Sequence, residues 1–293
     1  MLRTIFLGVL AASVLHPLAL AVDIEQAKMT FLHTASGVRF GVLGEKAATP
    51  SPTLFVFAND IEGTLESDNF NMVGHLLAKR GWLSISLDLP CHGKNLLSGE
   101  AGGSLECWRA RLESGRNFMP GFMANITDVL DYLIQHGYTD VNKVAACGTS
   151  RGGFVALHFA AVESRVRCVA AFAPVTNLLA LREFAGIEQD SPSVLRMVKS
   201  LALVNSAEKL AGRPIWICIG NYDQRVNTDY AIAFSRRVVE ASVAEDKPAN
   251  VEIRVLPSEG YQVRVHDNGH GIPVPSAHKE AAEWILARMG EAK

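Results

Sequence analysis

Apolar and polar residues follow two patterns along the chain, which predict strands separated by helices. Continuous apolar runs predict strands buried on both faces, at residues 53–58, 82–89, 144–147, 166–172, 215–219 and 251–256. Apolar residues at helical spacing predict helices, at residues 70–81, 122–137, 153–162, 230–242 and 276–289. Two more runs, 28–34 and 38–43, flank a turn and predict a hairpin. This alternation predicts an α/β fold with a mostly parallel central sheet and helices on both faces.

Two segments between these elements fit neither pattern well. Residues 94–118 are irregular and rich in glycine and charge, whereas residues 176–212 are mainly helical and are a candidate for a small cap insertion. We expect both segments to form the walls of the substrate pockets. Trp108 is a candidate contact there, as are Arg109 and Arg111, whose alternative role is solvated loop charge.

The first 21 residues have the pattern of a secretory signal peptide. A basic residue precedes the apolar stretch 5–15, and the sequence Ala19-Leu20-Ala21 follows, whose two alanines suit cleavage. Cleavage would leave residues 22–293 as a single domain of a secreted or periplasmic protein. The alternative is an uncleaved membrane anchor, which His16 and Pro17 disfavour because they interrupt the apolar run. No later stretch is apolar enough to span a bilayer, so no stable membrane partner is expected after cleavage.

Cysteine content and net charge suggest a disulfide and restrict the kinds of partner. An exported protein meets oxidising conditions, which makes the five cysteines informative. Cys91 and Cys107 lie in loop-like sequence and could form a disulfide, whereas Cys147, Cys168 and Cys218 lie in apolar runs as small buried side chains. The net charge of −2, with no basic run, argues against a nucleic-acid partner.

The segment Gly148-Thr149-Ser150-Arg151-Gly152 matches the pattern G-x-S-x-G. It directly follows a predicted strand and precedes a predicted helix, as a nucleophile elbow requires. The tight turn needs residues without bulk two positions before and after the serine, which glycine provides. The alternative is an ordinary glycine-rich turn. The setting favours Ser150 as a nucleophile at the carboxyl edge of the sheet.

A serine hydroxyl needs a base to take its proton, and that base needs a carboxylate to orient it. Asp223 follows the strand at 215–219 and is the candidate acid, with turn capping as its alternative role. His270 lies between two glycines after the last predicted strand and is the candidate base, with His266 as the alternative. His266, Asp267 and His270 could instead bind a metal. The helical spacing of such sites is missing, so neither a metal nor a cofactor is expected.

The oxyanion of an acyl-transfer intermediate needs two hydrogen-bond donors. One is the backbone N–H of Arg151, which follows the nucleophile. The other comes from the loop after strand 53–58, from Asn59, Asp60 or Ile61. The Arg151 side chain has two candidate partners, an anionic group of the substrate and a surface carboxylate.

From about residue 38 onward the chain resembles the α/β-hydrolase superfamily, most closely its prolyl-oligopeptidase and dienelactone-hydrolase-like branch. The motifs that carry the resemblance are Gly81-Trp82 leading to Asp88-Leu89-Pro90-Cys91-His92-Gly93, Gly148-Thr149-Ser150-Arg151-Gly152-Gly153, Gly220-Asn221-Tyr222-Asp223 and Gly269-His270-Gly271. The resemblance implies Ser150 as nucleophile, Asp223 as acid and His270 as base. The chain departs from the pattern in two ways. Dienelactone hydrolases typically use a cysteine nucleophile, and the large β-propeller of prolyl oligopeptidases is not expected here.

Together these residues predict a serine hydrolase that acts on a small-molecule carboxylic ester through an acyl-enzyme. A serine peptidase that cleaves short peptides with the same triad is the first alternative. A non-catalytic binding protein on a hydrolase scaffold is the second, and the intact triad pattern disfavours it.

Overall fold

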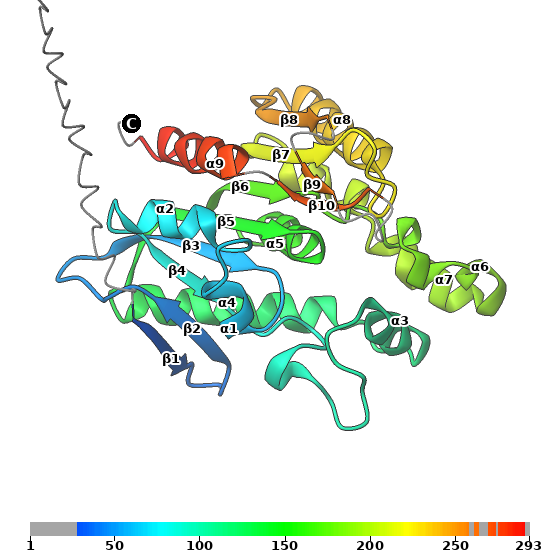
Figure 1. Ribbon diagram of the computed structural model, residues 1–293, viewed down its shortest axis with the longest axis horizontal. Helices are drawn as coiled ribbons and strands as arrows, with labels where there is room; N and C mark the ends of the chain where they lie inside the picture. Colours follow the sequence, from blue (N-terminus) through cyan, green and yellow to red (C-terminus); the bar gives the residue numbers. More distant parts are fainter. Residues whose placement is uncertain (1–27, 258–260, 264–268, 274, 291–293) are drawn as a thin grey trace, which may run out of the picture.

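The computed structural model describes residues 28–257, 261–263, 269–273 and 275–290 of the 293-residue chain. In this part of the chain a sheet has the strand order β1-β2-β4-β3-β5-β6-β7-β8 (Figure 1). The strands are β1 (Met29–His33), β2 (Arg39–Leu43), β3 (Ser51–Phe57), β4 (Leu83–Ser86), β5 (Thr139–Thr149), β6 (Val166–Phe172), β7 (Ile215–Gly220) and β8 (Val251–Leu256). The strands from β4 to β8 run parallel, and the predicted hairpin β1–β2 adds an antiparallel edge. The predicted α/β fold is confirmed.

Helices cover both faces of this sheet, as Figure 1 shows. The helices beside the sheet are α1 (Ile61–Leu65), α2 (Met72–Ala78), α4 (Met119–Gln135), α5 (Arg151–Val162), α8 (Thr228–Ala244) and α9 (Pro275–Arg288). Helices α2 and α9 pack together on one face, while α4 and α5 pack together on the other. Among the described residues, no helix has both the length and the apolar character needed to cross a bilayer.

The core lies between these layers and is formed by the central strands. Strands β6 and β7 bury nearly every side chain because helices cover both of their faces. Phe55 of β3 packs its ring against Phe159 of α5, with the ring centroids 5.2 Å apart. Such packing holds α5 against the sheet and so positions the turn that joins β5 to α5 at the carboxyl edge.

The predicted strand at 82–89 is too long, since β4 ends at Ser86. Beyond this point Asp88 accepts hydrogen bonds from the backbone N–H groups of Ile61 and Lys94, at 2.9 Å each. The Leu89 N–H donates to the Asn59 carbonyl. These contacts with the loop after β3 turn the chain out of the sheet.

The segment 94–118 is not irregular throughout, because it contains helix α3 (Leu105–Glu113). Leu105, Trp108 and Leu112 are buried on one side of this helix at helical spacing. The predicted helical stretch 176–212 contains α6 (Ile187–Asp190) and α7 (Pro192–Ser200) together with several short 3₁₀ helices. Figure 1 shows α3, α6 and α7 at one end of the molecule, outside the sheet.

Candidate active site

Ser150 lies in the turn between β5 and α5 with a left-handed φ of +56°. Residues other than glycine seldom adopt this conformation, and a strained residue of this kind is characteristic of functional turns. The Ser150 N–H donates to the Phe172 carbonyl at 2.8 Å, and the Ser150 carbonyl accepts from the N–H of Val175 at 3.1 Å. These bonds to the end of β6 hold Ser150 at the carboxyl edge of the sheet.

The two glycines of the motif are required by close backbone approach. A Cβ atom on Gly152 would overlap the Phe57 carbonyl at the end of β3. A Cβ atom on Gly148 would overlap the backbone of Gly152 across the turn. The strand–turn–helix can therefore pass beside β3 only when both positions lack a side chain, as a nucleophile elbow requires.

Asp223 follows β7 and is almost fully buried, with 2% of its surface exposed. Its Oδ1 accepts hydrogen bonds from the backbone N–H groups of Arg225 and Val226, at 3.0 and 3.1 Å. Its Oδ2 lies 2.8 Å from Nδ1 of His270. A carboxylate held in this way fixes the ring orientation and the tautomer of the histidine, and leaves Nε2 to act on a substrate.

Gly269 allows the loop that carries His270 to approach the loop that carries the acid. It has a φ of +79°, and a Cβ atom there would overlap the Tyr222 carbonyl. The alternative base, His266, lies outside the described residues, as does Asp267 of the alternative metal site.

Ser150 and His270 share one cavity of about 300 Å³. The residues that line it are Ala58, Asn59, Phe70, Gly103, Ser104, Leu105, Glu106, Thr149, Ser150, Arg151, Arg182, Glu183, Arg225, His270 and Gly271. Among the described residues, no hydrogen bond joins the Ser150 hydroxyl to His270. In the absence of substrate such contacts are often long, and they tighten when substrate binds. The geometry therefore brings the predicted serine and histidine to one cavity and couples the histidine to the predicted acid.

The three candidates for the second oxyanion donor differ sharply. The Ile61 N–H donates to Asp88, and the buried Ile61 does not line the cavity, so this candidate is excluded. Asp60 caps helix α1 by accepting from the Gly63 N–H, and it does not line the cavity either. Asn59 does line it, although its backbone N–H donates to Oγ1 of Thr64. Arg151 supplies the first candidate donor and lies on the wall beside Ser150.

The cavity wall contains a buried ion pair that the sequence did not predict. The Glu183 carboxylate accepts two hydrogen bonds from the Arg225 guanidinium, at 2.5 and 2.6 Å, and each residue is only 8% exposed. Burial acts to raise the pKa of Glu183, but the hydrogen bonds and the nearby positive charges, chiefly those of Arg225, together leave that pKa below its ordinary value. The two residues are 42 positions apart, so no local pattern could have paired them.

Arg151 has a different environment. Its guanidinium donates to the Gly103 carbonyl and to Oδ1 of Asn59, at 2.9 Å each, rather than to a carboxylate. Burial, followed by the charge of Arg225, lowers the pKa of Arg151 below its ordinary value. Of the two candidate partners of the Arg151 side chain, the surface carboxylate is therefore not found among the described residues.

The other proposed pocket contacts do not line the cavity. Trp108 is buried and donates from Nε1 to the Pro90 carbonyl at 2.8 Å. Arg109 pairs with Glu113 on the same helix. Arg111 is not solvated charge, because it is buried and makes a two-pronged contact with Glu100.

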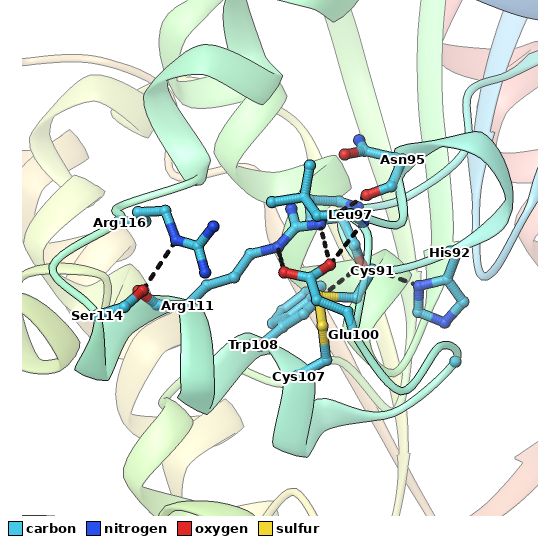
Figure 2. Close-up of a disulfide and its surroundings, with 12 residues drawn as sticks. Cys91, His92, Asn95, Leu97, Glu100, Cys107, Trp108, Arg111, Ser114 and Arg116 are labelled. Carbon is cyan, nitrogen blue, oxygen red and sulfur yellow. Dashed lines mark hydrogen bonds and ion pairs between the residues drawn. A yellow bond between two sulfur atoms is a disulfide. The ribbon is translucent and has the colours of Figure 1, made fainter.

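A disulfide joins Cys91 to Cys107, as the sequence allowed, and closes the loop before α3 (Figure 2). Inside this loop Glu100 faces Arg111, and the Arg111 side chain also donates to the Asn95 carbonyl (Figure 2). The sulfur atoms of the disulfide and the Glu100 carboxylate lie within 4.8 Å of one another. Oxidised sulfurs and a carboxylate bound to Arg111 are poor metal ligands, so this cluster acts as a structural brace.

The model of the "Prolyl oligopeptidase family" matches residues 121–289, more than half of the chain. Comparison with curated protein sequences gives no match.

Solved structures with this fold include both peptidases and esterases. The chain is similar to dipeptidyl peptidase 4 of Porphyromonas gingivalis (TM-score 0.62, 16% identity, 89% of this chain and 35% of that one). It is similar to the TT1662 protein of Thermus thermophilus (TM-score 0.62, 20% identity, 91% of this chain and 99% of that one). It is also similar to an acetyl xylan esterase from a Paenibacillus species (TM-score 0.62, 15% identity, 91% of this chain and 86% of that one). The chain spans between 35% and 40% of the length of several peptidases that it resembles.

Proposed function

The chain belongs to the prolyl oligopeptidase family of serine hydrolases, and from this premise we propose that it hydrolyses carboxylic esters through an acyl-enzyme on Ser150. The observation that carries the proposal is the hydrogen bond between Asp223 and Nδ1 of His270 in a cavity that Ser150 also lines. Each residue then has one role: Ser150 is the nucleophile, His270 the base and Asp223 the group that orients the base.

The reaction runs in two steps on this arrangement. Nε2 of His270 takes the hydroxyl proton as Oγ of Ser150 attacks the ester carbonyl. The resulting oxyanion accepts a hydrogen bond from the Arg151 N–H, which points from the first turn of α5. His270 gives its proton to the leaving alcohol, and the acyl group remains on Ser150. Water then loses a proton to His270, attacks the acyl-enzyme and releases the acid.

Two observations favour an ester over a peptide with a free amino terminus. The buried carboxylate of this cavity, Glu183, is committed to Arg225, so the ammonium of an aminopeptidase substrate would have to bind the exposed carboxylate of Glu106, where water competes for it. Solved structures with this fold also include a cold-adapted esterase and an acetyl xylan esterase, which the chain matches along 92% and 86% of their length. The family match keeps peptide hydrolysis by the same three residues as the second candidate.

The test compares two substrate series on one purified protein. We expect hydrolysis of 4-nitrophenyl esters of graded acyl length, weak or no cleavage of aminoacyl 4-nitroanilides, and labelling of Ser150 by a fluorophosphonate probe. Ser150→Ala should lose activity more than about a thousandfold, whereas Ser164→Ala, at an exposed turn, should retain it. Faster cleavage of the anilides would make the protein a peptidase, and an active Ser150→Ala would overturn both candidates.

The identity of the base is tested in the same assays. His270→Ala should be as inactive as Ser150→Ala, because no other group would take the hydroxyl proton. His266→Ala should keep its activity. The reverse result would assign the base to His266.

We also propose that the protein is exported, with cleavage after Ala21. The N-terminal pattern supports this, and a disulfide between Cys91 and Cys107 suits an oxidising compartment. N-terminal sequencing of protein from a periplasmic or culture fraction should begin at Val22. Recovery of the intact N-terminus from membranes would favour the anchor.

A further inference from the structure

Asn59 presents only its side chain to the cavity as a hydrogen-bonding group. It follows β3 and lies on the wall that Ser150 shares. Its backbone N–H donates to Oγ1 of Thr64 at 2.9 Å, and its carbonyl accepts from the Leu89 N–H at 3.0 Å. Both backbone groups are thus engaged with neighbouring turns. What remains available to a substrate is the amide at the end of the side chain.

Arg151 fixes the orientation of that amide. An Nη2 hydrogen of Arg151 is donated to Oδ1 of Asn59 at 2.9 Å. A guanidinium has donors and no acceptor, so it can face only the oxygen of an amide. Nδ2 of Asn59 must then point away from Arg151 with its two N–H groups. The structure shows no hydrogen bond from Nδ2 to any described residue.

Arg151 is itself held in place from the opposite side. Its Nη1 donates to the Gly103 carbonyl at 2.9 Å, and the Gly103 N–H donates to the Cys91 carbonyl at 2.9 Å. Cys91 is one end of the disulfide shown in Figure 2. The guanidinium therefore bridges the loop after β3 and the disulfide-closed loop. A contact that crosses the cavity wall in this way sets the position of the Asn59 amide.

We propose that Nδ2 of Asn59 is the second oxyanion donor and that Arg151 is its positioning residue. The proposal rests on Ser150 being the nucleophile. Negative charge develops on the carbonyl oxygen as Oγ attacks, and a preoriented N–H that meets this charge lowers the barrier. Arg151 draws electron density from Oδ1 of the same amide, which makes the Nδ2 hydrogens stronger donors. The charge of Arg151, which forms no direct ion pair among the described residues, thus acts on the oxyanion through Asn59.

Asn59→Asp separates this role from a structural one. Aspartate has the same shape and can still accept the Arg151 hydrogen bond, but a carboxylate has no hydrogen to donate. A similar loss in the uncharged Asn59→Ala would exclude repulsion between the new carboxylate and the oxyanion as the cause. We expect kcat to fall about 100-fold or more, as for removal of an oxyanion donor, while KM changes less than about threefold. Asn59→Ala should fall by a similar factor, and the exposed Asn205→Ala is the matched control.

Arg151→Met tests the positioning role. We expect it to lower kcat about tenfold in the wild-type background and to have almost no effect once Asn59 is alanine, since the two residues act as one unit. Additive losses would overturn the positioning role. A rise in KM confined to esters that carry a carboxylate would show instead that Arg151 binds an anionic substrate directly.

These outcomes are distinct from those that test the nucleophile. An Asn59→Asp variant that is folded, as judged by its thermal midpoint, and within threefold of the wild-type kcat would overturn the inference. The proposed function would survive that result if Ser150→Ala were inactive. An active Ser150→Ala would remove the proposed function itself. If Asn59→Asp fails to fold, the Asn59→Ala variant decides by the same threshold.

Discussion

Gly152 of helix α5 lies so close to Phe57 of strand β3 that a Cβ atom on the glycine would overlap the phenylalanine carbonyl oxygen. The carbonyl belongs to the backbone of a buried central strand, which cannot move aside as a flexible side chain could. The approach of the elbow to β3 therefore requires that position 152 has no side chain.

Gly152→Ala should lower both stability and activity. The new methyl group can be accommodated only by moving α5 away from β3, which displaces Ser150. We expect a fall of several degrees in the thermal midpoint and a loss of at least about tenfold in kcat/KM. Gly121→Ala is the matched control, because nothing lies within 4 Å of a Cβ atom there and alanine favours a helix. Equal behaviour of the two variants would contradict the argument.

The sequence predicts the elements whose signal is local. Strands β6 and β8 have the predicted bounds, because each strand extends as far as the run of residues that predicts it. The elbow was also predictable, since the glycines that permit it lie within five residues of one another. The predicted serine, acid and histidine likewise follow from loop positions at the carboxyl edge.

The structural features that the sequence could not predict depend on contacts between segments that are distant in the chain. Strand β4 ends early because Asp88 binds backbone groups that belong to other loops. Arg111 is buried because Glu100 meets it across a loop that a disulfide closes. One missed element did have a local signal: the spacing of Leu105, Trp108 and Leu112 indicates helix α3, but the glycines before it hide the pattern.

Asp223→Asn should leave the fold intact and remove most of the activity. The amide can present its NH₂ group to Nδ1 of His270, which would favour the tautomer with its proton on Nε2 and block the base. We expect kcat to fall about 10⁴-fold. Asp229→Asn, in the exposed first turn of α8, is the control and should keep the wild-type rate. A loss in Asp223→Asn that is smaller than about tenfold would argue against its role as the orienting acid.

Removing only one partner of the Glu183–Arg225 pair should strongly lower the free energy of unfolding. Glu183→Gln leaves the buried Arg225 charge without its carboxylate, and we expect the free energy of unfolding to fall by about 3–5 kcal/mol. Arg225→Met in the same chain removes the remaining charge and should recover at least half of that loss. Urea unfolding of both single variants and of the double variant measures the coupling. A double variant as unstable as the sum of the single changes would show that the pair does not interact energetically.

The disulfide should support both stability and the cavity wall. The bond closes a 16-residue separation, so the double variant Cys91→Ala/Cys107→Ala should lose about 3 kcal/mol in the free energy of unfolding. It should also lower kcat/KM, because Gly103 anchors Arg151 from inside the same loop. Reductant should reproduce both effects in the wild type and leave the double variant unchanged, since the three free cysteines are buried. A wild-type protein that is indifferent to complete reduction would contradict the prediction.

Acid should weaken the disulfide-closed loop through Glu100. Hydrogen bonds from Arg111 lower the pKa of this carboxyl from 4.5 to about 2 in the folded protein. As pH falls, the Glu100 carboxyl therefore takes up a proton in the unfolded chain before it does so in the folded protein. Its contribution to the free energy of unfolding is complete above about pH 5 and is lost as pH falls toward 2.

Urea unfolding of wild type and Glu100→Gln at several pH values measures this contribution. The difference in the free energy of unfolding between the two proteins should be constant from pH 7 to about 5 and should shrink steadily below that. Glu45→Gln, at an exposed site with no ion pair among the described residues, should match the wild type throughout. A difference that stays constant down to pH 3 would mean that Glu100 stabilises the loop without its charge. The contact with Arg111 would then act as a neutral hydrogen bond, and the brace would be insensitive to acid.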